Sequence, residues 1–101
     1  MSKVGGTSGI NDYIDIHKIS FDHKCQDNAG SSMRFTIEEP GGGYSEQWFN
    51  ETTWTHHEYT YPTPKRHVDG TGWALQFIPE GIWGNWHYID NVYIDFTYTD
   101  V

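Results

Sequence analysis

The feature that most constrains the fold is a series of short stretches in which apolar and polar residues alternate. Residues 33–38 read Met-Arg-Phe-Thr-Ile-Glu, with every apolar residue at an odd position. Residues 12–23 and 88–98 alternate in the same way, each with one change of phase of the kind that a β-bulge produces. Successive side chains of a strand point to opposite faces, so these stretches predict strands with one buried face.

Turn-forming residues separate six or seven such stretches at the spacing typical of a sandwich or barrel. Proline cannot donate to a strand ladder, so we expect Pro62 and Pro64 to end one strand and Pro79 to end another. The predicted strands cover residues 12–23, 33–38, 44–50, 54–61, 73–78 and 88–98, with turns or loops at 26–31, 39–43, 65–72 and 81–86. We predict an all-β fold, an antiparallel β-sandwich of jelly-roll type.

The predicted core consists of the inward positions of these strands. The chain has two alanines and one leucine, whereas aromatic residues make up 17% of it, so we expect a core of aromatic and β-branched side chains. Trp73 shares its phase with Leu75 and Phe77 and is therefore expected inside. The other residues expected inside are Ile14, Ile16, Ile19, Phe21, Met33, Phe35, Ile37, Ile89, Val92, Ile94 and Phe96.

Length, charge and cysteine content restrict the class of protein. The chain of 101 residues is the size of one domain, and we assign residues 10–101 to it; residues 1–9 read as a flexible lead or as residues left from expression. Cys25 is the only cysteine, so an internal disulfide is excluded. The net charge of −8 argues against nucleic acid and anionic membranes as partners.

The second half of the chain carries a resemblance to a known group of domains. Trp54, Tyr59 and Tyr61 alternate in one stretch, Leu75-Gln76-Phe77 follows, and the chain closes with Tyr-Ile-Asp-Asn-Val-Tyr-Ile at residues 88–94. In this order the motifs resemble the C-terminal half of jelly-roll carbohydrate-binding modules of families 4, 9 and 22. The Asn-Gly-Gly-Phe-Glu-like segment with which those modules begin is absent here.

The resemblance implies a non-catalytic module that binds a neutral polysaccharide of the β-glucan type. Such modules are parts of larger multidomain proteins, and we expect this one to be extracellular or at the cell surface. The resemblance also implies a structural calcium ion at Asp90, and we expect no other cofactor.

The predicted ligand-binding residues combine exposed aromatic rings with polar side chains. Indole and phenol rings offer flat apolar planes to the C–H faces of sugars, and directional polar groups select hydroxyl positions. The aromatic candidates are Trp83, Trp86, Trp48, Tyr44 and Trp54, and the polar candidates are Gln76, Arg34 and His57. The sequence leaves open which way Trp54 faces, and it leaves His56 as an alternative to His57.

Two other functions compete with this interpretation. The loop tryptophans would equally suit a structural or interaction protein, such as a phage, virion or surface-layer component, where they would anchor a protein partner. The chain also has six histidines, and a small metal-dependent enzyme could use His56, Glu58 and His87 as ligands. Adjacent His56 and His57 point to opposite faces of a strand, so they cannot bind one ion together.

Overall fold

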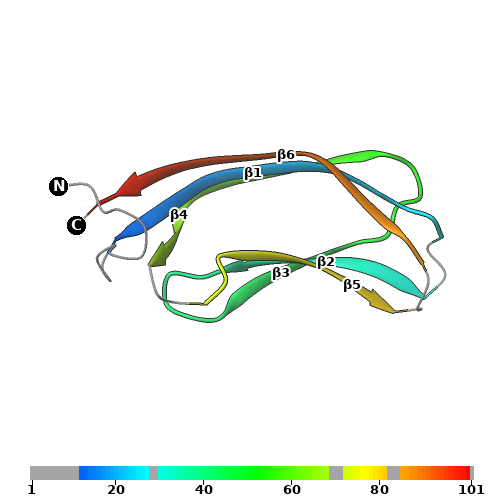
Figure 1. Ribbon diagram of the computed structural model, residues 1–101, viewed down its shortest axis with the longest axis horizontal. Helices are drawn as coiled ribbons and strands as arrows, with labels where there is room; N and C mark the ends of the chain where they lie inside the picture. Colours follow the sequence, from blue (N-terminus) through cyan, green and yellow to red (C-terminus); the bar gives the residue numbers. More distant parts are fainter. Residues whose placement is uncertain (1–11, 28–29, 69–71, 82–84, 101) are drawn as a thin grey trace.

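A computed structural model of the chain describes residues 12–27, 30–68, 72–81 and 85–100. These residues form two three-stranded antiparallel sheets that lie face to face (Figure 1), which confirms the predicted all-β sandwich. One sheet has the strand order β4-β1-β6 and the other β3-β2-β5. The strands are β1 (Tyr13–Cys25), β2 (Ser31–Glu38), β3 (Tyr44–Phe49), β4 (Thr55–Val68), β5 (Leu75–Gly81) and β6 (His87–Thr99). Within the described ranges, no helix is long and apolar enough to cross a membrane.

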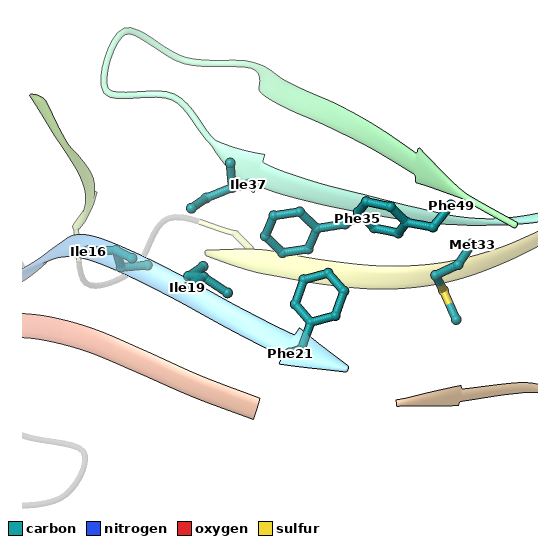
Figure 2. Packing of buried hydrophobic residues seen from close by; sticks show 7 residues of the cluster. All are labelled: Ile16, Ile19, Phe21, Met33, Phe35, Ile37 and Phe49. Carbon is teal, nitrogen blue, oxygen red and sulfur yellow. The ribbon is translucent and has the colours of Figure 1, made fainter. Parts of the chain in front are cut away.

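The core fills the space between the sheets and comes mainly from the two central strands. Figure 2 shows side chains from β1 and β2 pointing toward one another, joined by Phe49 from β3. Each ring or branched chain buried here contributes about 1.5–3 kcal/mol relative to exposure. The cluster consists of Ile16, Ile19, Phe21, Met33, Phe35, Ile37 and Phe49, of which all but Phe49 were expected from alternation.

Both predicted changes of phase are confirmed as irregularities of β1 and β6. On β1, the register with both neighbours shifts between Ile16 and Lys18, so that Ile16 and Ile19 both face the core. On β6, the register shifts between the partners of Ser20 and Asp22, where Asn91 adopts a positive φ of 53°. A residue inserted into one strand of a pair produces this pattern.

The expectation that prolines end the strands was wrong. β4 continues through Pro62 and Pro64 to Val68, so residues 65–68 are strand rather than loop. Between the pairs Ile16–Lys65 and Lys18–Thr60, β1 has one residue and β4 has four. Pro62 and Pro64 are both among these four unpaired residues of β4. Pro79 lies within β5. Both β4 and β5 are outer strands of their sheets, and outer strands tolerate proline because one side of the strand has no ladder to supply.

Three side chains expected in the core are exposed. Trp73 is 67% exposed because β5 begins only at Leu75, so the alternation does not extend back to it. Val92 lies in the irregular part of β6 and is half exposed. Phe96 pairs with Ile16 and shares its face, but it lies on an outer strand near the end of β6 that runs past the other sheet (Figure 1).

Candidate functional site

The outer face of the β3-β2-β5 sheet brings together four of the residues predicted to bind ligand. Phe49 of β3 faces the core, so Trp48 and Tyr44 point outward from the same strand. In the register of the sheet, Arg34 of β2 lies opposite Trp48, and Gln76 of β5 lies opposite the outward-facing Thr36. Residues directly opposite in a sheet share a face, so these side chains form one surface.

Two aromatic side chains on this surface and one next to it are open to solvent. The exposed fractions are 43% for Tyr44, 53% for Trp48 and 67% for Trp73. Trp73 lies beside Tyr44, because the Tyr44 hydroxyl donates a hydrogen bond of 3.0 Å to the Trp73 carbonyl. We call Tyr44, Trp48, Trp73, Arg34 and Gln76 the platform.

Arg34 is held in place by all three strands of the sheet. Its guanidinium lies 5.6 Å from the centroid of the Trp48 ring, within the range of a cation–π contact. One terminal nitrogen lies 2.8 Å from a Glu80 carboxylate oxygen on β5, and the other lies 3.7 Å from Glu46 on β3. These contacts restrict the rotamers of both Arg34 and Trp48.

Gln76 supplies a free amide to the same surface. Its side chain is half-buried in the register position next to Thr36, and the described residues give the amide no hydrogen-bond partner. An amide has both donor and acceptor groups. The platform therefore combines apolar rings, an anchored cation and an unengaged amide.

The remaining aromatic candidates lie elsewhere on the molecule. Trp54 is half exposed beside β1 of the other sheet, where the Lys24 ammonium lies 5.2 Å from its ring and 5.4 Å from the ring of Tyr88. Trp86 is 66% exposed just before β6. Trp83 lies outside the described residues. The predicted aromatic set is thus divided between different surfaces.

His57 does not share the outer face expected of it. Its ring packs 4.1 Å from that of Phe49 and 5.4 Å from that of Phe21, and its Nε2 lies 2.5 Å from Glu51 Oε1. The strand directs it inward because its register partner Phe21 faces the core.

His56 points the opposite way from His57, as predicted. Its Nδ1 lies 2.7 Å from Asp22, and its Nε2 lies 3.6 Å from Glu58. The hydrogen bond with Asp22 raises the pKa of His56 above its ordinary value. His87, by contrast, lies inside the sandwich, so the expected metal site of His56, Glu58 and His87 is wrong.

Asp90, the residue that the resemblance assigned to calcium, is exposed on β6. One carboxylate oxygen accepts a hydrogen bond of 2.8 Å from the Asn91 backbone N–H. Among the described residues, the groups of three or more metal-ligating side chains do not include Asp90. Calcium binding there stays a prediction.

A second polar cluster, inside the sandwich, was missed by the sequence analysis. His23 Nδ1 lies 2.6 Å from Glu51 Oε1, and His23 Nε2 lies 2.9 Å from His87 Nδ1. His87 Nε2 lies 3.0 Å from the Ser31 hydroxyl, and His57 contacts the same Glu51 oxygen as His23. The sequence indicates only that His23 points inward, because it follows Ile19 and Phe21 at every second position of β1.

Burial and hydrogen bonding act in opposite directions on the acid of this cluster. Burial raises the pKa of Glu51, but the hydrogen bonds from His57 and His23 outweigh it and hold the pKa below its ordinary value. For His87, burial and then the neighbouring His23 lower the pKa, so its neutral form is favoured. The cluster therefore contains one carboxylate, Glu51, in contact with the imidazoles of His23 and His57, and the imidazole of His87 contacts His23.

Comparison with known proteins found no matching family model, no matching curated protein and no matching solved structure.

Proposed function

We propose that the protein is a non-catalytic carbohydrate-binding module that binds a neutral polysaccharide of the β-glucan type across the platform. The observation that carries the proposal is the presence of exposed Trp48 and Tyr44 on the same sheet face as Arg34 and Gln76, with exposed Trp73 next to Tyr44. The fold would be of jelly-roll type. Supporting this, β1 pairs with β6 in one sheet while β2 pairs with β5 in the other, the nested pairing of strands that a jelly roll winds.

The platform has the dimensions of an extended ligand rather than of a single sugar. Tyr44 and Trp48 are four residues apart on one strand, which separates them by about 13 Å. Their rings would stack on the C–H faces of successive sugars, while the Arg34 guanidinium and the Gln76 amide would hydrogen-bond the hydroxyls between them. A shallow surface of this kind loses much of its contact energy to association costs, so we expect dissociation constants near the micromolar range or weaker.

Charge supports a neutral rather than an anionic ligand. The chain carries a net charge of −8, and the only cation of the platform, Arg34, already lies against two carboxylates. A uronic-acid polymer would meet Glu46 and Glu80 on this face with little compensating charge. We propose an extracellular or cell-surface location within a larger protein, because such polymers lie outside cells.

Affinity electrophoresis tests this function directly. The protein is run through gels that contain cellulose derivatives, xylan, mannan or mixed-linkage β-glucan, with a polyuronate gel as the charged control. Retardation in at least one neutral gel, but not in the polyuronate gel, is the expected result. Unchanged migration in every gel would overturn the proposal.

The exposed apolar residues of β6 favour a second candidate, a protein-interaction domain. Val92, Tyr93, Phe96 and Tyr98 are each at least half exposed, and β6 is an outer strand with β1 on one side. Apolar side chains on an open strand suit pairing with another chain. Light scattering separates the two functions: a stable oligomer or co-purifying partner favours interaction, and a monomer that binds glycans favours the platform.

A further inference from the structure

Three possible metal ligands converge at the end of the sandwich where β1 ends. Nδ1 of His23, Nε2 of His57 and Oε1 of Glu51 all lie within 4.8 Å of one another. The two nitrogens lie 2.6 Å and 2.5 Å from the carboxylate oxygen. His23 comes from β1, His57 from β4 and Glu51 from the connection between β3 and β4, so three separate segments meet here.

The walls of this cluster are apolar and rigid. His23 is fully buried, and its ring stacks on that of His87 at 5.2 Å with an interplanar angle of 21°. Phe49 lies against both imidazoles, at 6.0 Å from His23 and 4.1 Å from His57. Metal sites have such walls, because an apolar surround strengthens the bonds between an ion and its polar ligands.

Hydrogen bonds behind His23 hold its ring so that Nδ1 faces Glu51. The Ser31 hydroxyl donates to the Glu80 carbonyl at 3.1 Å, and with its single hydrogen so placed it accepts from Nε2 of His87. That leaves Nδ1 of His87 to accept from Nε2 of His23, which lies 2.9 Å away. Nδ1 of His23 shares a proton with Glu51 in the metal-free protein, and an ion would replace this proton, because ligands bind metals in their deprotonated form. A metal-binding histidine characteristically donates its second ring nitrogen in this way.

We propose that His23, Glu51 and His57 form a binding site for a divalent transition metal, with Zn²⁺ as the favoured ion. Two imidazole nitrogens and one carboxylate oxygen are a donor set for zinc, whereas calcium and magnesium take oxygen ligands. Three protein ligands leave a fourth position for water. The site is distinct from the platform, which lies on the outer face of the other sheet.

Glu51 has to move for the ion to enter. Ligands at about 2.0–2.1 Å from a tetrahedral zinc ion lie about 3.3 Å from one another, which is longer than the present separations of the carboxylate oxygen from the two nitrogens. Glu51 precedes β4 and its side chain is 22% exposed, so it can rotate outward by somewhat under an ångström. The two histidines lie on strands, and their ligand nitrogens are within 4.8 Å of one another.

Metal titration of the untagged full chain tests the site. The protein is stripped with a chelator and titrated with Zn²⁺ by calorimetry and with Co²⁺ by visible absorption. We expect one ion per chain, cobalt bands of a four-coordinate nitrogen–oxygen site, and a melting temperature raised by roughly 10 °C at a hundredfold excess over the dissociation constant. Binding of no ion, or of ions at several equivalent weak sites, would overturn the proposal.

The neighbouring histidines provide a matched pair of variants. His57→Ala should weaken zinc binding by about a hundredfold or more, whereas His56→Ala, which removes an identical side chain from the opposite face, should leave it unchanged. If His57→Ala fails to fold, histidine nitrogen NMR of the original chain replaces it. Zinc should then shift Nδ1 of His23 and Nε2 of His57 and leave His17, His56 and His67 in place. Equal losses in the two variants, or shifts at the latter three histidines, would contradict the site.

Discussion

The guanidinium of Arg34 lies 5.6 Å from the centre of the Trp48 ring, on the outer face of the β3-β2-β5 sheet. Arg34 is also held by Glu80 and Glu46 on the two flanking strands. The contact with Arg34 restricts the orientation of the exposed Trp48 ring. It is the local basis for treating this sheet face as a preformed binding surface.

Replacing Arg34 should loosen Trp48 without unfolding the domain. Arg34→Met keeps much of the aliphatic bulk but removes the cation and both carboxylate contacts, so the indole gains rotamers. With 5-fluorotryptophan in the protein, we expect the fluorine signal of Trp48, assigned through Trp48→Phe, to shift and narrow. The signal of Trp54, on the other sheet, serves as the internal control. An unchanged Trp48 signal would show that Arg34 does not orient the ring.

Gly81 should be intolerant of any side chain. It has a φ of +100°, and a Cβ atom there would lie 2.0 Å from the Gly30 carbonyl oxygen. We expect Gly81→Ala to lower the free energy of unfolding by roughly 3 kcal/mol, since it adds both strain and a backbone clash. Gly41→Ala is the matched control, because nothing lies within 4 Å of its Cβ position. Urea denaturation measures both, and equal stabilities would contradict the structure of this turn.

Asn91 marks the irregularity of β6 through its backbone conformation. Its φ of 53° is strained for a β-branched residue, and its side-chain amide donates a hydrogen bond of 2.7 Å to Asp22. We expect Asn91→Val to lose about 2 kcal/mol of stability. Asn91→Gly should lose less, because glycine relieves the strain and only the hydrogen bond is lost. Thermal denaturation ranks the two, and the reverse order would contradict the bulge.

Acid should weaken the link between the two sheets at Glu39 and Lys65. The Lys65 ammonium lies 2.5 Å and 3.0 Å from the two Glu39 oxygens, and hydrogen bonds from Lys65 and Ser45 lower the pKa of Glu39 below 4.5. A carboxyl whose pKa is lowered by folding stabilises the protein above its unfolded pKa, and this contribution is lost as pH falls through the folded value.

The Glu39→Gln variant measures the size of this link. Both side chains are partly exposed, so we expect it to lower stability by up to about 1 kcal/mol at pH 7. The difference from the original chain should shrink below pH 4.5. Urea unfolding at several pH values records it, and a difference that stayed constant into acid would exclude the ion pair as its cause.

Alternation predicted the central strands well because it reports burial on one face. Ile16, Ile19 and Phe21 on β1 and the odd residues of β2 are buried as expected, and both changes of phase occur where predicted. The predicted ends of the outer strands β4 and β5 were wrong. Pro62, Pro64 and Pro79 belong to strands that have a neighbour on one side only, which a sequence without known pairing does not reveal.

The candidate sites were predictable only where strand parity sufficed. Parity placed Arg34 and Gln76 on solvent faces, and Trp48 and Tyr44 were predicted to be exposed, but only the pairing of β2 with both β3 and β5 brings the four together. The His23, Glu51 and His57 cluster carries no motif, since its members are 28 and 6 residues apart in the chain. Trp54 could not be assigned to a sheet from its position before β4.

Calorimetric titration of two tryptophan variants tests the central claim most directly. The ligand is the neutral polysaccharide that retards the protein most strongly, and Trp48→Ala is compared with Trp54→Ala, which removes an equally exposed indole beside the other sheet. We predict that Trp48→Ala weakens binding by about tenfold or more, close to 1.4 kcal/mol, and that Trp54→Ala binds as the original chain does. A full loss in Trp54→Ala with normal binding by Trp48→Ala would contradict the assignment of the binding surface to the β3-β2-β5 sheet.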